Sequence, residues 1–81
     1  MSIPKDITGD KLAKLLIYYD YKVTRQKGSH IRLTTTKGGT HHITIPKHNP
    51  LKVGTLNGII SDIACHFKLS KKDVLEELFG E

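Results

Sequence analysis

The residues best suited to chemistry lie in the stretch KGSHIRL, Lys27–Leu33, where a histidine directly follows a Gly-Ser pair. A Gly-Ser pair is typical of a tight bend, and Ile31 and Leu33 alternate as strand residues do. His30 therefore stands where a strand begins, in the phase opposite to the apolar residues. Because an imidazole takes or gives a proton near neutral pH, His30 is a candidate general acid or base. The alternative is a histidine that only binds a phosphate or a backbone carbonyl.

Charge is distributed unevenly along the chain, and this favours a polyanionic partner. The formal net charge is +5, yet no Asp or Glu occurs from Tyr21 to Ser61. That segment has seven Lys or Arg residues, so the rest of the chain carries a net charge of −2. The basic residues are Lys22, Arg25, Lys27, Arg32, Lys37, Lys47 and Lys52, with His30, His41, His42 and His48 among them. Such a segment is typical of nucleic-acid binding, although a solvated basic surface has the same composition.

RNA would bring its own nucleophile to this surface, since a 2′-hydroxyl lies beside each phosphodiester. One group that removes the hydroxyl proton and one that protonates the leaving 5′-oxygen are enough to cut the chain. Lys and Arg would stabilise the charge that develops on the phosphorus oxygens. The basic segment has no carboxylates with which to hold a divalent metal. We therefore expect a reaction that needs neither a metal nor a cofactor.

The other histidines are weaker candidates for catalysis. His42 should share the face of His30 but lie roughly 13 Å away, too far for both to act on one phosphodiester. His48 is the better second group, as an acid or a phosphate ligand, and the alternative is an exposed loop histidine. We expect no zinc site, because His41 and His42 point to opposite strand faces and Cys65 has no paired cysteine. The expected RNA contacts are Lys22, Arg25, Lys27, Ser29, Arg32, His42 and His48.

Three helices are expected around these residues. Thr8 is suited to cap the first, whose apolar face comprises Leu12, Leu15, Leu16 and Tyr19. In VGT, Gly54 and Thr55 precede the second helix, with Thr55 as its expected cap. That helix has an apolar stripe of Leu56, Ile59, Ile60, Ile63 and Phe67. The last helix begins at Ser70 with Asp73 in a capping-box position, and its apolar residues are Val74, Leu75 and Leu78.

Three strands are expected at about 21–26, 30–36 and 41–46. Their inward residues would be Tyr21, Val23, Ile31, Leu33, Ile43 and Ile45. The opposite face would show Lys22, Thr24, Gln26, His30, Arg32, Thr34, His42 and Thr44. Leu33 and Ile43 share a face only if paired residue numbers sum to an even number, which places His30 near Pro46. A three-residue loop in TKGGT satisfies this condition, with its second glycine left-handed, and Gly28 is expected to adopt a conformation that other residues avoid.

The order α-β-β-β-α-α predicts an α+β fold in which a three-stranded antiparallel sheet packs one face on the helices. The 81 residues are expected to form a single domain, 1–81, with a modest core. No apolar run approaches the roughly 20 residues of a membrane helix, and MSIPKDITGD lacks the apolar region of a signal peptide. With one cysteine and no internal disulfide, the chain is expected to be cytoplasmic.

Two stretches, RQKGSHIRL and ITIPKHNPLKVGTLNGIISDIA, resemble the HicA-type (YcfA-like) toxins of bacterial and archaeal toxin–antitoxin pairs. The resemblance extends from Leu12 to about Leu78. It rests on the Gly-Ser-His, Ile-Pro-x-His and Leu-Lys-x-Gly-Thr-Leu elements, which occur in the family's order and spacing. It implies a fold like that of the double-stranded-RNA-binding domain, α-β-β-β-α, to which this sequence adds a short C-terminal helix.

The resemblance also implies an activity and a partner. HicA-type toxins are mRNA interferases, metal-independent ribonucleases that block translation, and a HicB-type antitoxin neutralises them. The family's catalytic histidine corresponds to His30, and Gly28 and Ser29 match the rest of its motif. The next position, often a second histidine in the family, is Ile31 here; it points inward, so the chemistry should survive. His48 matches a family histidine to which we carry over no role.

Two other readings of the same residues stay open. A non-catalytic RNA-binding module would use the basic surface alone, and an adaptor would use it to bind an acidic protein. An antitoxin is itself such a partner, and we expect it to cover the basic sheet face and His30. The role of His30 separates the enzyme from both alternatives.

Overall fold

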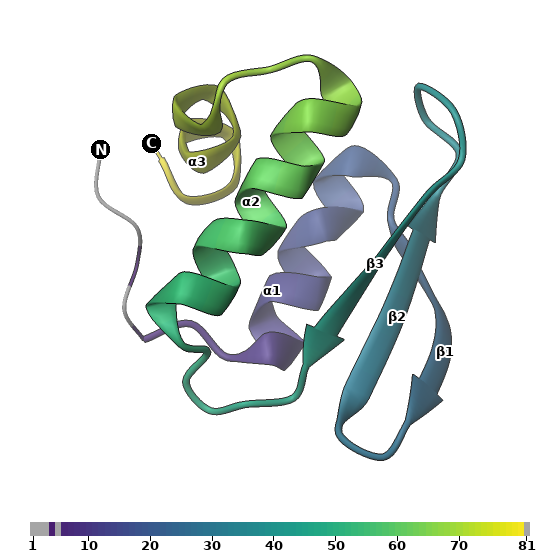
Figure 1. Cartoon of the computed structure of the whole chain (residues 1–81), viewed down its shortest axis with the longest axis vertical. Helices are drawn as coiled ribbons and strands as arrows, with labels where there is room; N and C mark the ends of the chain where they lie inside the picture. Colours follow the sequence, from purple (N-terminus) through teal and green to yellow (C-terminus); the bar gives the residue numbers. More distant parts are fainter. Residues whose placement is uncertain (1–3, 5, 81) are drawn as a thin grey trace.

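The computed structural model describes residue 4 and residues 6–80 (Figure 1). Its elements are α1 (Gly9–Leu15), the 3₁₀ turn η1 (Leu16–Tyr19), β1 (Lys22–Lys27), β2 (His30–Thr35), β3 (His41–Pro46), α2 (Val53–Phe67) and α3 (Lys71–Phe79). The predicted order of helices and strands is confirmed, and the fold is α+β. The expectation about a signal peptide falls partly on residues 1–3 and 5, which lie outside the described residues.

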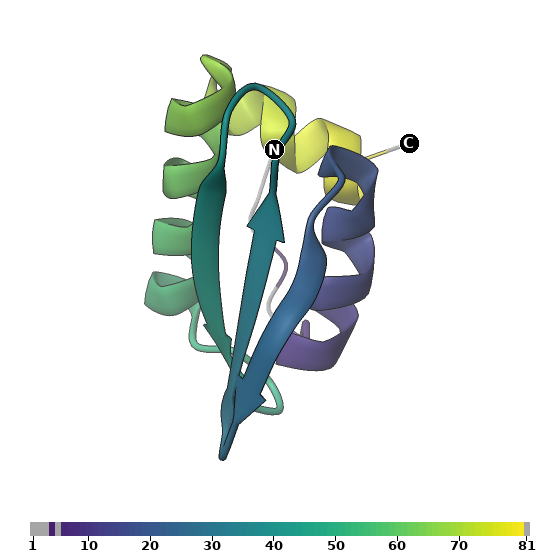
Figure 2. The ribbon, with the colours of Figure 1, turned by 90° about the vertical axis from the view of Figure 1, so that its right-hand side faces the viewer.

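The three strands form one antiparallel sheet in the order β1-β2-β3. Figure 2 shows α1 and α2 behind this sheet, while the other sheet face is open. Leu33 pairs with Ile43 and His30 pairs with Pro46, which confirms the predicted register of β2 and β3. The hairpin between them contains Gly39 at φ +105°, as expected, and also a left-handed Gly38 at φ +70°.

Two of the three predicted helix caps are present. The Thr8 side chain accepts a hydrogen bond from the Lys11 N–H (3.1 Å), and Ser70 accepts one from the Asp73 N–H (3.0 Å). The third prediction is wrong, because α2 begins at Val53 and Thr55 already lies inside its first turn. A cap residue must itself have a non-helical backbone, so Thr55 cannot serve as one. The extended residue before α2 is Lys52, and it makes no side-chain capping bond.

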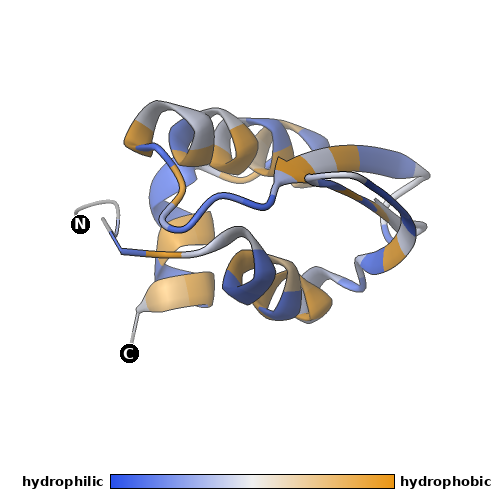
Figure 3. Ribbon diagram, turned by 90° about the horizontal axis from the view of Figure 1, so that it is seen from below, coloured by the Kyte–Doolittle hydropathy of each residue, from blue (hydrophilic) through white to orange (hydrophobic). Residues whose placement is uncertain are grey.

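The core lies between the sheet and the helices. Its fully buried side chains are Leu12, Leu16, Tyr21, Leu33, Ile45, Leu56, Ile60, Ile63, Val74 and the polar Thr35. Figure 3 shows hydrophobic and hydrophilic residues alternating along the ribbons, as expected when each element buries one face. The predicted apolar stripes are therefore confirmed for their central residues, while Leu15 and Phe67 are only partly buried.

Val23 departs from the predicted core. It pairs with Leu33 and so lies on the inner side of the sheet, as expected, but its side chain is 55% exposed. The reason is the position of the helices: α1 and α2 both pack against β3, at the far edge of the sheet. β1 forms the opposite edge, and the helices pack less closely against it.

Candidate functional site

His30 is the first residue of β2 and directly follows the two-residue turn Gly28–Ser29. Gly28 has φ +57°, the left-handed value that primed hairpin turns require, and this confirms its predicted role. A Cβ at Gly28 would meet nothing within 4 Å, so the glycine is needed for its backbone conformation rather than for space. His30 is exposed while Ile31 is buried, so the histidine points away from the core.

β1 contains a β-bulge. Its pairs with β2 are Lys22–Thr34, Val23–Leu33, Arg25–Arg32, Gln26–Ile31 and Lys27–His30, with a register shift between Val23 and Arg25. Thr24 is therefore an extra residue, and two residues of β1 oppose one of β2 at this point. Because side chains alternate between the faces of a strand, each residue of β1 after the extra one lies on the face opposite to the one predicted without a bulge.

The bulge brings two more cations to the face of His30. Arg25 lies opposite Arg32, and Lys27 lies opposite His30. Without a bulge, the alternation would place Gln26 on this face, but Gln26 pairs with the buried Ile31 and so lies on the inner side of the sheet. The prediction for Gln26 is therefore wrong, while Arg25 and Lys27 lie on the same face as His30.

We call the open surface of the sheet the basic face, defined by Lys22, Arg25, Lys27, His30, Arg32 and His42. All six residues are exposed. Among the described residues the ion pairs are His41–Asp62 and Lys47–Asp10, and neither involves the basic face. The charges of this surface are therefore not neutralised by a carboxylate of the described chain, and they create a positive field toward solvent.

A chain of hydrogen bonds crosses the basic face away from His30. Thr24 Oγ1 lies 2.9 Å from Thr34 Oγ1, which lies 2.8 Å from Nδ1 of His42. These bonds orient the His42 ring, and its Nε2 makes no hydrogen bond to the described part of the chain. Thr34, the partner of His42, is four strand residues from His30, or roughly 13 Å. The structure thus keeps His42 and His30 apart, as predicted.

The loop after β3 is hydrogen-bonded to the Gly28–Ser29 turn. The Lys47 N–H donates to the Ser29 carbonyl (2.6 Å), and the Gly9 N–H donates to the His48 carbonyl (3.1 Å). Lys47 Nζ also lies 3.9 Å from Asp10 Oδ1. His48 is therefore held in the segment next to the turn, and its side chain is exposed.

The other end of the sheet has a histidine cluster that sequence reasoning missed. The His41 Nδ1 lies 2.7 Å from the Tyr21 hydroxyl, and its Nε2 lies 3.3 Å from Asp62 Oδ1. The His41 ring stacks on His66 at 4.4 Å, and the His66 Nε2 lies 3.0 Å from the Lys37 carbonyl. Burial, and then the charge of Asp62, raise the pKa of Tyr21. The cluster connects the β2–β3 hairpin to α2. In the sequence, the four-residue spacing of Asp62 and His66 indicates only that both side chains lie on one face of the helix.

Neither a metal centre nor a membrane span is found in residues 4 and 6–80. No group of three His, Cys, Asp or Glu side chains is placed there to hold a metal ion. No helix in this part of the chain has the length and apolar character needed to cross a bilayer.

Variants next to the bulge can show whether RNA contacts particular residues of the basic face or only responds to the net charge of the protein. Arg25→Ala is expected to weaken binding of single-stranded RNA and to lower the slope of log Kd against log salt by about 0.7, the value for one phosphate contact. Gln26→Ala should leave the slope unchanged, since Gln26 lies on the inner phase. Lys72→Ala, which removes an exposed cation of α3, is the charge-matched control. Filter binding over a salt series, in the His30→Ala background, measures the slopes; equal slopes for Arg25→Ala and Lys72→Ala would contradict a localised contact.

Fold and site together define a class: a small α+β protein whose three-stranded sheet presents, on its open face, histidines and cations that form no ion pair with the described residues. The family described as the HicA toxin of bacterial toxin–antitoxin systems matches residues 9–64, a range that includes every strand. Because this match covers well over half of the chain, the protein belongs to the HicA toxin family. Searches of curated proteins and of solved structures gave no match. Membership implies a cognate antitoxin.

Proposed function

We propose that this HicA protein is a metal-independent endoribonuclease, an mRNA interferase that cuts mRNA and so inhibits translation, with His30 as general acid or base. The placement of His30 is the observation that supports this most. Its imidazole is exposed at the start of β2, opposite Lys27 and on the same face as Arg32. A phosphodiester bound there would meet a proton-transfer group and several cations at once.

In the proposed reaction the 2′-oxygen bonds to the adjacent phosphorus, and the bond from phosphorus to the 5′-oxygen breaks. A base takes the proton of the 2′-hydroxyl, and an acid gives a proton to the leaving 5′-oxygen. The products are a 2′,3′-cyclic phosphate and a 5′-hydroxyl, so no water or metal enters this step. Arg25, Lys27 and Arg32 would stabilise the charge on the non-bridging oxygens.

His48 is our candidate for the second group, as the acid or as a phosphate ligand. It follows by two residues Pro46, which pairs with His30, and its loop is hydrogen-bonded to the Ser29 carbonyl. Ser29, next to His30, would contact the RNA backbone beside the reacting phosphate, and Lys22, which pairs with Thr34, would contact it further along the sheet. His42 would contact RNA further along the sheet, outside the reaction.

The cognate antitoxin is proposed to cover the basic face and His30. A carboxylate of the antitoxin placed among these cations would find positive charge that no carboxylate in residues 6–80 pairs with. Antitoxin and RNA would then compete for one surface, and neutralisation would follow from exclusion of the substrate.

The test is the dependence of cleavage on the 2′-hydroxyl. The purified protein is expected to cut an unstructured mRNA in excess EDTA and to leave 2′,3′-cyclic phosphate ends, which mass spectrometry of the products detects. An oligonucleotide with one 2′-deoxynucleotide at the cut position should bind equally well but resist cleavage. Cleavage of that oligonucleotide would show that water is the nucleophile. Binding of both RNAs without cleavage would identify a non-catalytic RNA-binding module.

A further inference from the structure

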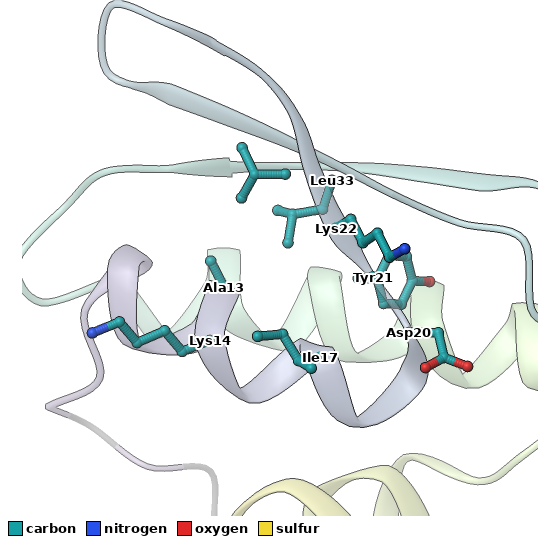
Figure 4. A pocket seen from close by; sticks show the side chains of 8 residues that line it. Ala13, Lys14, Ile17, Asp20, Tyr21, Lys22 and Leu33 are labelled. Atoms are coloured by element: carbon teal, nitrogen blue, oxygen red, sulfur yellow. The ribbon is translucent and has the colours of Figure 1, made fainter.

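A groove lies between the first helix and the edge strand β1, and Lys22 of the basic face is among the residues that line it (Figure 4). It has a volume of about 430 Å³. Ala13 and Ile17 form one apolar wall, and Val23 and Leu33 form the other. Figure 4 shows Ala13 and Ile17 extending from the helix toward Leu33 of the sheet. The groove is therefore an apolar opening into the edge of the core.

The groove exposes apolar surface that the fold does not use. Ile17 is 64% exposed and Val23 is 55% exposed, and both line the groove. Tyr18, next to Ile17, is also exposed but does not line it. Large apolar side chains gathered on one surface opening mark an interaction site more often than isolated ones do.

The strand beside the groove is an unpaired edge. β1 bonds to β2 on one side only, so alternate residues of β1 direct their N–H and C=O groups away from the sheet. These groups can bind an added strand. The groove has room for one or two side chains but not for a helix, whose diameter is about 10–12 Å. Edge and groove together fit an extended segment with one apolar anchor.

The charges beside the groove decide what kind of segment fits. Lys14 and Lys22 line the groove with Asp20, and Arg25 and Lys27 follow along β1. A second copy of the chain paired edge to edge would bring the cations of both β1 strands together, which is unfavourable. An acidic segment would find complementary charge along the whole strand.

We propose that an acidic, extended segment of the cognate antitoxin adds to the free edge of β1 and inserts one apolar side chain into this groove. The choice of partner rests on the proposed function, whereas the groove and the edge do not. The antitoxin would then hold the toxin from both sides of β1. The apolar anchor would lie in the groove, whereas the acidic residues of the segment would meet Lys22, Arg25 and Lys27 of the basic face and so compete with RNA for these cations.

The test measures how tightly the cognate antitoxin binds variants of Ile17 and Val23, which line the groove, and of Tyr18, which does not. Ile17→Glu and Val23→Glu are expected to weaken binding by roughly 100-fold, as for the loss of a central apolar anchor. Tyr18→Glu, equally exposed but outside the groove, should change Kd by less than about threefold. Amide hydrogen exchange of Lys22–Lys27 in the wild-type complex should slow relative to the free protein. Isothermal titration calorimetry and exchange mass spectrometry give the two readouts.

Unchanged binding of Ile17→Glu, or unchanged exchange in β1, overturns the proposal. A wild-type protein that dimerises in sedimentation, and that Ile17→Glu makes monomeric, overturns it too, because the groove would then hold a second copy. RNA cleavage by the free variants should equal that of the wild type. If the wild-type protein does not cleave RNA but still binds the antitoxin in a way that depends on the groove, the proposed activity is refuted and this interface is supported. Failure of the proposed function and failure of the proposed interface are therefore distinguishable.

Discussion

His30→Ala is expected to lower the rate of RNA cleavage by about 10²–10⁴-fold, the range that one general acid or base contributes. The free energy of unfolding should change by less than about 0.5 kcal/mol, because the side chain is exposed and makes no hydrogen bond in the described structure. Single-turnover cleavage in excess EDTA measures the first quantity, and urea denaturation measures the second. Large loss of rate with unchanged stability would identify a group that acts on the substrate rather than on the fold.

Two further variants decide what His30 does. His30→Gln keeps hydrogen-bonding groups but cannot transfer a proton, so it should be as slow as His30→Ala. Recovery of the rate in His30→Gln would show that His30 only binds phosphate. His42→Ala is the matched control, since His42 is exposed on the same face but roughly 13 Å away; its rate should fall by no more than about tenfold. Unfolding of His30→Ala would contradict the assignment of His30 to the open face.

The sequence was sufficient where a local pattern decides the structure. Leu33 and Ile43 must share a face, and this requirement, with the two-glycine hairpin, determined the register that brings His30 to Pro46. Thr8 and Ser70 were predicted as caps because each can bind an N–H three residues later. The open face of β2 and β3 followed from the alternation of their residues, and its lack of acids followed from the absence of Asp and Glu between Tyr21 and Ser61.

The sequence was insufficient where the outcome depends on residues distant in the chain. In KVTRQK only Val23 is apolar, so the pattern of β1 has no second apolar residue that would reveal a bulge at Thr24. The exposure of Val23 depends on where α1 packs, which no strand pattern encodes. The contact of His41 with Asp62 joins residues 21 positions apart. The bulge places Arg25 and Lys27 on the basic face, and the packing of α1 leaves Val23 exposed in the groove.

Gly9 is a further residue whose importance is visible only in the fold. It is the first residue of α1 and is buried against the end of β3. A Cβ built at Gly9 would lie 2.3 Å from the Pro46 carbonyl oxygen, and the Gly9 N–H donates to the His48 carbonyl (3.1 Å). The helix can approach the loop after β3 this closely only because no side chain intervenes.

Gly9→Ala is therefore expected to destabilise the protein by about 2–3 kcal/mol, from steric overlap and a weakened hydrogen bond. Alanine's higher helix propensity, up to about 1 kcal/mol, offsets only part of this. Displacement of Pro46–His48 would move the partner of His30, and misplacement by about 1 Å can cost roughly 100-fold in rate. Urea denaturation and cleavage assays far below the unfolding temperature measure the two effects separately.

Gly58→Ala is the matched control for Gly9→Ala. Gly58 lies inside α2, and a Cβ there would meet nothing within 4 Å. This variant should be as stable as the wild type or more stable by up to about 1 kcal/mol, with unchanged cleavage. If Gly9→Ala behaves like Gly58→Ala, the close approach of α1 to Pro46 does not position the site. If Gly9→Ala loses rate even where it is fully folded, the N-terminal end of α1 is a positioning element for His30.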